Sequence, residues 1–319
     1  MVVIGLLMGV MVGCAGTGSS KSDQSMTLYT CASANVEEAV VKGFQAAHAG
    51  ATVNVFRAPT GQLNARVASD LRSGGIQADV IWACDPLTMY GYDGQQLLRV
   101  WTPPNAAEIP SAYRTPNFVG IDLLYVVPVA HKGTPVPVSW ADLTKPAYTG
   151  KVALPSPSFA ASALGALGYF ATAPGYGMGF YRDLKNNKAV QVNAPSDALT
   201  GAEQGSYPVG VTLANAAYAD QRKGSPIEVV WPKPGGIAIY APIGLTTKKN
   251  ASPLAEEFAG YAASRAGQQV MADQGTYVTI AGLGGPPIPA GSLTVSPDWT
   301  VLAKQYKSVL ADYVAIFGS

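Results

Sequence analysis

The chain has 319 residues, of which 13% are charged, and its formal net charge is +1. This balance leaves neither a basic field for nucleic acid nor an acidic tail, so recognition of any partner must come from a local site. Two histidines and three cysteines are too few to suggest a zinc or copper site, and we expect neither a bound metal nor a cofactor.

The first 13 residues form an apolar run that ends at Cys14, and a polar stretch follows. Residues 10–14 resemble a bacterial lipobox, in which small residues precede a cysteine that is acylated at the mature N-terminus. Met11 stands where leucine is usual, and no lysine or arginine precedes the run. We expect residues 1–13 to be a lipoprotein signal peptide, and residues 14–25 to be a flexible linker after the lipidated Cys14. The protein would then be extracytoplasmic and anchored to the cell membrane by its lipid; the alternative is a short core helix.

Short apolar strands alternate with segments of helical spacing in the next part of the chain. In chain order, the sequence predicts a strand at 26–30, a helix opened by an Asn35–Glu38 capping box and running to 47, a strand at 51–58, a helix at 61–71 and a strand at 78–83. This order implies parallel pairing with right-handed crossovers, and ligands collect at the carboxyl ends of such strands. Three strand ends are therefore candidate binding segments, at residues 30–35, 57–62 and 84–86.

A second unit follows a long apolar strand at residues 118–129. Its predicted elements are a short helix at 139–143, a strand at 151–154, an Ala-rich helix to about 171, helices at 178–184 and 196–204, a strand at 207–213, a helix at 215–222 and strand-like segments at 227–231 and 236–245. Helices at 253–271 and 298–317 complete the chain. Roughly 290 residues after the linker exceed what one hydrophobic core serves, so we expect two lobes. Lobe 1 is predicted at residues 26–129 and 242–319, and lobe 2 at 130–241.

Several segments, in this order and spacing, resemble a known family. They are Leu28-Tyr29-Thr30, Thr60-Gly61-Gln62-Leu63, Ala78-Asp79, Ser139-Trp140-Ala141-Asp142-Leu143, Pro155-Ser156-Pro157-Ser158, Tyr207 to Ala214, and Pro242 to Thr247. The chain resembles extracytoplasmic solute-binding proteins of ABC importers, in the group that binds ferric iron, thiamine, hexose phosphates and aminoethylphosphonate. The resemblance implies an α/β fold of the type 2 periplasmic-binding-protein class, with two lobes, two crossover strands and a ligand cleft between the lobes. It also implies a monomer that delivers a small solute to an ABC transporter permease.

The residues at the strand ends favour an anionic solute, with a phosphonate or a phosphate ester preferred. Ser33, Ala34 and Asn35 lie where a strand turns into a helix, so free backbone N–H groups would face the cleft. Ser156 and Ser158 occupy the equivalent place in lobe 2, and their hydroxyls add donors for phosphoryl oxygens. The alternative is that each serine only caps its helix.

Other candidate ligand-binding residues rest on their position alone. Thr60 and Gly61 follow the second strand, where a plain turn is equally possible. Asp85 follows the third strand and would pair with a ligand amine, or else cap the next helix. Asn215 and Tyr218 lie at a strand-to-helix junction of lobe 2.

Iron is the alternative solute. Ferric binders of this group use a histidine after the first strand, a glutamate after the third and two adjacent tyrosines in lobe 2. The corresponding positions here hold Ser33, Cys84-Asp85 and Ala217-Tyr218. Asp85 and Tyr218 alone would need a synergistic anion to hold a trivalent cation.

Cys31 and Cys84 end the first and third strands, which lie side by side in the family's sheet order. We expect a disulfide between them, which an extracytoplasmic setting permits. The alternative is two buried free thiols.

An enzyme and a structural surface lipoprotein are the competing classes of protein. The sequence has no Gly-x-Ser-x-Gly motif, and neither His48 nor His131 lies near a serine in a suitable context. We therefore expect binding without catalysis; a structural lipoprotein would lack a cleft.

Overall fold

A computed structural model describes residues 24–318 of the chain. The predicted signal peptide and the lipid attachment site at Cys14 lie outside the described residues. Within the described part, no helix combines the length and the apolar character needed to cross a membrane.

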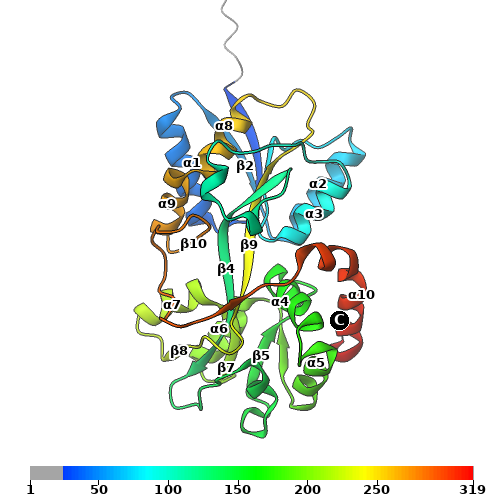
Figure 1. The fold of residues 1–319 in the computed structure, drawn as a ribbon, viewed down its shortest axis with the longest axis vertical. Coiled ribbons are helices and arrows are strands. Elements are labelled where there is room, and N and C mark those ends of the chain that lie inside the picture. Colours follow the sequence, from blue (N-terminus) through cyan, green and yellow to red (C-terminus); the bar gives the residue numbers. More distant parts are fainter. Residues whose placement is uncertain (1–23, 319) are drawn as a thin grey trace, which may run out of the picture.

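Two α/β lobes lie one above the other and are joined by long strands (Figure 1). The strands are β1 (Ser25–Thr30), β2 (Thr52–Arg57), β3 (Val80–Trp82), β4 (Phe118–His131), β5 (Val152–Pro155), β6 (Val190–Val192), β7 (Val209–Leu213), β8 (Ile227–Val229), β9 (Gly236–Leu245), β10 (Tyr277–Val278) and β11 (Thr294–Val295). The α-helices are α1 (Ala34–Ala47), α2 (Thr60–Arg72), α3 (Pro86–Gly94), α4 (Ala161–Thr172), α5 (Gly177–Asn186), α6 (Pro195–Glu203), α7 (Ala214–Arg222), α8 (Leu254–Ala263), α9 (Arg265–Asp273) and α10 (Trp299–Phe317). Most of the predicted elements are confirmed within a few residues.

The strands form one mixed sheet with the order β2-β1-β3-β9-β4-β7-β5-β6. β1 pairs in parallel with β2 and β3, as the alternating pattern predicts, and β7, β5 and β6 are likewise parallel. β4 and β9 are antiparallel to each other and lie in the centre, where β9 meets β3 and β4 meets β7. These two strands carry the chain between the lobes, so the fold is the expected two-lobed α/β architecture with two crossover strands.

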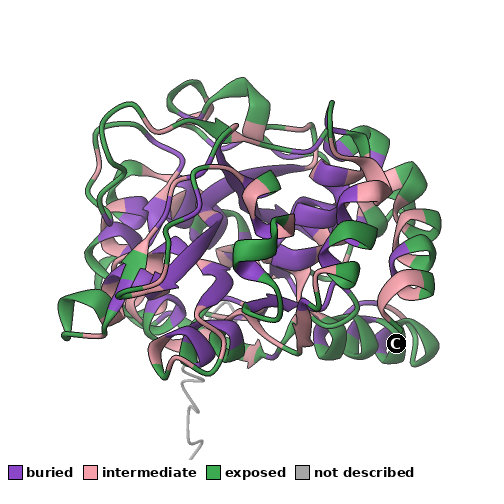
Figure 2. Ribbon diagram, turned by 90° about the horizontal axis from the view of Figure 1, so that it is seen from below, coloured by how far each residue is buried: buried purple, intermediate pink, exposed green. Residues whose placement is uncertain are grey.

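The apolar faces of the elements explain this arrangement. All ten residues of β9 are buried, which suits a strand covered by helices on both faces. In lobe 1, α1 buries Val36, Val40 and Phe44, and Phe44 meets Phe258 of α8 edge to face with ring centroids 5.2 Å apart. Figure 2 shows the buried strands in the middle of the molecule and exposed helix faces around them.

The N-terminus of α1 differs from the prediction. Ser33 is the N-cap residue, and its side chain makes no capping hydrogen bond. The predicted Asn35–Glu38 capping box is therefore wrong, because both residues already lie inside the helix.

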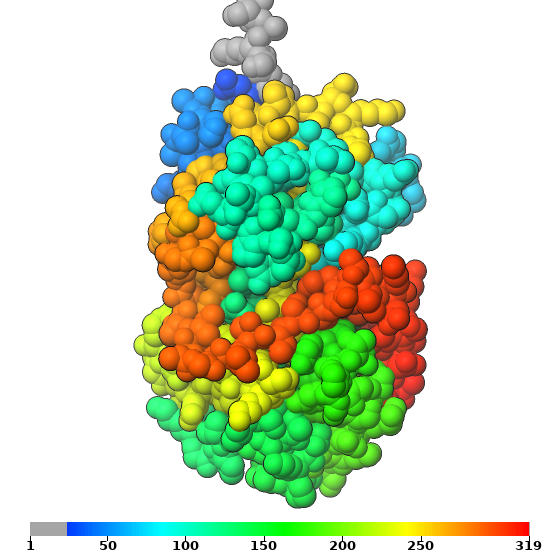
Figure 3. Space-filling model, viewed as in Figure 1, coloured from blue at the N-terminus to red at the C-terminus, as the bar shows by residue number. Residues whose placement is uncertain are grey.

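The C-terminal helix α10 corrects the predicted lobe boundaries. After β10 the chain runs back across the molecule, with β11 pairing with β9, and Figure 3 shows this segment as an orange band below lobe 1. α10 packs on α4 and α5 and also touches α3. The Tyr313 ring lies 5.1 Å from that of Tyr181, and its hydroxyl donates to Gln191 Oε1 at 2.9 Å. Assigning residues 242–319 to lobe 1 is wrong for α10, because its apolar face is buried against lobe 2.

The ends of β1 and β3 are joined covalently. Cys31 and Cys84 form a disulfide, with Cα atoms 5.8 Å apart and a sequence separation of 53. The parallel pairing of β1 with β3 brings the two cysteines together.

Candidate functional site

Two adjoining cavities lie between the lobes. The inner cavity, of about 380 Å³, is bounded by the ends of β1, β2 and β3 from lobe 1, by the crossover strands, and by the starts of α4, α6 and α7 from lobe 2. The outer cavity, of about 660 Å³, lies between α2 and α3 on one side and α4 and α10 on the other. Four residues line both cavities, namely Pro59, Thr60, Phe159 and Ala161. The two cavities are therefore parts of one interlobe cleft.

Five helices begin at the wall of the inner cavity. The lining residues at these starts are Ser33 (α1), Thr60 (α2), Ala161 (α4), Pro195 (α6) and Asn215 (α7). In α1, α2, α4 and α7, the N-cap side chain makes no hydrogen bond to the helix. The first N–H groups of a helix lack partners within it and carry the positive end of the helix dipole. Helix starts from both lobes therefore give the inner cavity a positive potential.

Arg57 adds a full positive charge to this cavity. It ends β2, is exposed and lines the inner cavity. Arg57 takes part in none of the ion pairs of the described residues. Its exposed guanidinium interacts electrostatically with Glu37, where it opposes the rise in the pKa of that carboxyl that burial causes, and can bind a carboxylate, phosphonate or phosphate group.

Asp122 is the acidic residue of the inner cavity. It lies on β4, is 6% exposed, and its Oδ1 has no hydrogen-bond partner among the described residues. Burial raises the pKa of Asp122 from 3.8 to about 8. Trp82 Nε1 and Asn215 Oδ1 are also buried without partners at this cavity, so both remain free for a ligand.

The cleft gathers only some of the predicted ligand-binding residues. Ser33, Thr60 and Asn215 line the inner cavity, whereas Gly61, Asp85 and Ser158 line the outer one. Ala34, Asn35, Ser156 and Tyr218 line neither cavity. Ser33 and Ser158 thus line adjoining parts of the same cleft, and their pairing around one solute remains a prediction.

Hydrogen bonds explain three of these differences. Ser156 is 1% exposed, and its Oγ accepts from the Ser158 backbone N–H at 3.2 Å, so it holds the turn before α4. The Tyr218 hydroxyl accepts from Trp231 Nε1 at 2.9 Å. Asp85 caps α3 by accepting from the backbone N–H and the hydroxyl of Thr88, both at 2.8 Å. The capping interpretation of Asp85 therefore holds.

The arrangement also bears on the iron alternative. Asp85 faces the outer cavity with both oxygens engaged, and Tyr218 faces neither cavity. No group of three or more His, Cys, Asp or Glu side chains able to hold a metal occurs within residues 24–318. The two side chains that the iron alternative needs are not brought together.

Sequence reasoning missed Arg57, Trp82 and Asp122 as individual site residues. Arg57 falls in one of the marked strand ends, but its role was not assigned. Asp122 is the lone charge in the apolar strand at residues 118–129. That isolated carboxylate was a usable signal, since a buried charge without a structural partner points to a functional site.

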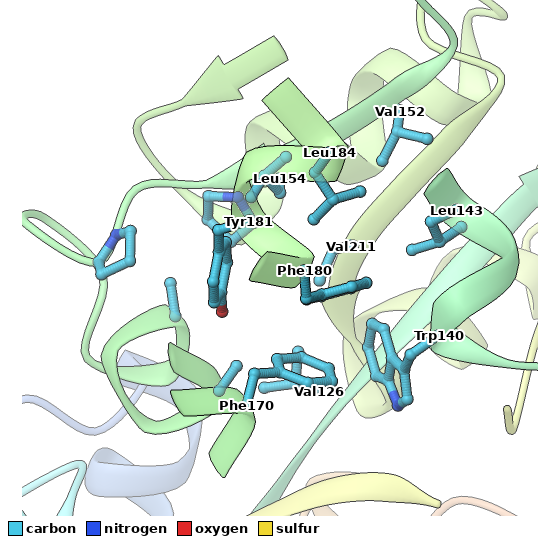
Figure 4. A pocket seen from close by; sticks show the side chains of 14 residues that line it. Val126, Trp140, Leu143, Val152, Leu154, Phe170, Phe180, Tyr181, Leu184 and Val211 are labelled. Carbon is cyan, nitrogen blue, oxygen red and sulfur yellow. The ribbon is translucent and has the colours of Figure 1, made fainter. Parts of the chain in front are cut away.

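A third cavity lies inside lobe 2 and is apolar (Figure 4). It measures about 30 Å³, close to the volume of one water molecule, and residues such as Trp140, Phe170, Phe180 and Val211 line it. It is a packing gap in the core of lobe 2, unsuited to a polar solute.

Comparison with known proteins places the chain in a family. Residues 26–276 match the family model described as bacterial extracellular solute-binding protein. A spermidine/putrescine-binding periplasmic protein of Escherichia coli strain K12 is 35% identical over 107 residues, which are 31% of this chain and 30% of that protein. The chain thus matches less than a third of the length of this curated relative.

Solved structures share the fold at low sequence identity. AfuA from Actinobacillus pleuropneumoniae, with fructose-6-phosphate bound, has a TM-score of 0.80 and 17% identity over 92% of this chain and 98% of that one. Iron-bound HitA from Pseudomonas aeruginosa has a TM-score of 0.79 and 19% identity over 91% of this chain and 99% of that one. With the interlobe cleft and the family match together, the chain belongs to the bacterial extracellular solute-binding proteins.

Proposed function

We propose that this protein captures a small anionic solute, with a phosphonate or phosphate ester preferred, and delivers it to an ABC transporter permease. The observation that carries the proposal is the convergence of five helix N-termini and Arg57 on one cavity between the lobes. AfuA, which has the same fold, holds a phosphate ester. We propose no iron site, because Asp85 and Tyr218 are engaged elsewhere.

The mechanism is closure of the lobes about the solute. A ligand shifts the balance between open and closed forms only through contacts that differ between them. A solute held by Ser33 and Arg57 of lobe 1 and by the α4 and α7 starts of lobe 2 favours the closed form. The permease would recognise this form, presented by a monomer that is held at the membrane through Cys14.

Isothermal titration of the purified protein tests the proposal. The probes are ethylphosphonate, glucose-6-phosphate, putrescine and ferric citrate. Binding of a phosphonate or phosphate ester supports it; binding of putrescine or ferric citrate alone, or turnover of any probe, contradicts it.

Removing the Arg57 charge should weaken binding of the best anionic probe by about 10- to 100-fold, since a hydrogen bond to a charged group contributes about 1.5–3 kcal/mol. The variant is Arg57→Gln, measured by titration. Arg72→Gln is the matched control, because Arg72 is exposed in the last turn of α2 and lines neither cavity. Equal affinities in the two variants would place the anion away from β2.

Substitution of the two candidate serines should have different effects on solute affinity. Ser33→Ala removes a free hydroxyl from the inner cavity and should weaken binding by about 3- to 10-fold, the effect of one neutral hydrogen bond. Ser158→Ala should leave affinity unchanged, since Ser158 faces the outer cavity. The reverse pattern in titration would move the site into the outer cavity.

A further inference from the structure

Asp122 occupies an unusual position on the crossover strand β4. The strand has a bulge between Gly120 and Asp122, and Asp122 lies opposite Ala241 of β9 and Val278 of β10. Neither neighbour offers a hydrogen-bonding or charged side chain. The carboxyl group is 6% exposed and lines the inner cavity.

The other buried aspartates all have the hydrogen-bond donors that Asp122 lacks. Asp70 accepts from the Tyr29 hydroxyl, the Gln77 N–H and Arg66 Nε, and Asp79 accepts from two backbone N–H groups and Lys248 Nζ. Asp85 accepts twice from Thr88. Asp122 Oδ1 alone among these four residues has no partner. A buried carboxyl group is costly when one of its oxygens has no hydrogen-bond partner, so a structural role does not account for it.

The remaining donors and acceptors of the cavity fit a ligand with two different ends. Arg57 and Asp122 are its basic and acidic lining residues, and they do not pair with each other. Asn215 Oδ1 is a second buried acceptor without a partner, while Trp82 Nε1 is a donor left for an anionic oxygen. Acceptors and donors are thus both unsatisfied in the same cavity.

We propose that Asp122 binds an ammonium group of the solute, so that the inner cavity takes a zwitterion whose anionic end meets Arg57 and the helix N-termini. This inference rests on the proposed function and narrows its substrate class. The ammonium group supplies the hydrogen-bond donors and the positive charge that no protein side chain supplies to Asp122.

The experiment compares two probes that differ only by the amine, 2-aminoethylphosphonate and ethylphosphonate, by titration of the full chain. The amine should improve affinity at least 10-fold. Asp122→Asn should remove this preference, so that the two phosphonates bind the variant with similar affinities. Asp183→Asn is the control, since Asp183 is exposed on α5 and lines neither cavity.

Protonation gives a second readout. Because burial holds the pKa of Asp122 at about 8, the free protein carries this proton at pH 7, and an ammonium ligand displaces it. Binding of the aminophosphonate should release more protons than binding of ethylphosphonate, as seen from the dependence of the binding enthalpy on the buffer. Arg57 is the other charged group facing this cavity, and Ala241 and Val278 contribute none. Asp122→Asn should abolish this additional proton release.

Stability shows whether the Asp122→Asn variant is folded. The folded state keeps a proton between pH 3.8 and about 8 that the unfolded state loses, so Asp122 makes stability fall as pH rises through this window. Asp122→Asn should therefore raise Tm near pH 8 and leave it almost unchanged near pH 4.

The outcomes separate the inference from the proposed function. Equal affinity for the two phosphonates, or an amine preference that survives in Asp122→Asn, overturns the inference and leaves anion binding intact. Binding of putrescine without binding of either phosphonate overturns both.

Discussion

Asp79→Ala should lower the free energy of unfolding by about 3–5 kcal/mol, the cost of breaking a buried ion pair by removing one partner. Asp79 is 1% exposed and accepts from the Thr27 N–H at 2.7 Å, Lys248 Nζ at 2.8 Å and the Ser252 N–H at 2.9 Å. It therefore fixes β1 to the segment that follows β9. Without the carboxylate, two backbone donors and one ammonium lose their partner. Urea denaturation followed by circular dichroism measures the change.

Two further variants define the cause of this loss. Asp220→Ala removes an exposed pair with Lys223 in which the Lys side chain is 75% exposed, and should cost less than about 1 kcal/mol. Lys248→Met in the Asp79→Ala background should restore part of the stability, because it removes the stranded ammonium. If Asp79→Ala and Asp220→Ala cost the same, the Asp79 network does not stabilise lobe 1 in the way proposed.

The sequence predicted most elements because their periodicities are strong, and it failed where tertiary contacts decide. Helix α3 was missed because its nine residues include two glycines and lack a clear apolar stripe. It forms because Asp85 caps it and because Leu87, Met89 and Tyr92 are buried. For α10, the pattern predicted the helix but not the lobe on which it packs, because an apolar face alone does not determine which surface of the protein covers it.

The site was predictable to the extent that it depends on strand ends. Ser33 and Thr60 follow the parallel strands β1 and β2 of lobe 1, whereas Asn215 follows β7 of lobe 2, which runs in the opposite direction. The carboxyl ends of the two groups of strands therefore meet at the inner cavity from opposite lobes. Asp122 escaped this reasoning because it lies inside a continuous strand, where the long course of β4 between the lobes brings it to the cleft. Ser156 and Tyr218 were placed on the right segments, but local hydrogen bonds direct their side chains elsewhere.

Removing the disulfide between Cys31 and Cys84 should lower the free energy of unfolding by about as much as Asp79→Ala does. Bridging cysteines 53 positions apart restricts the unfolded chain, and the entropic estimate for a loop of this length is about 4 kcal/mol. The double variant Cys31→Ser with Cys84→Ser should lose this amount in urea denaturation under oxidising conditions. Dithiothreitol should destabilise the unmodified protein equally and leave the double variant unchanged.

The same change should reach the binding site, because the loop closed by the disulfide carries Arg57 and Thr60, and both cysteines line the inner cavity. Ordering these side chains around a solute costs more conformational entropy when the loop is free at both ends. Affinity for the best anionic probe should therefore fall in the double variant. This is measured by titration without urea, under conditions in which the double variant is fully folded. A double variant that loses stability but binds as tightly as the original would mean that β1 and β3 hold the site by their pairing alone.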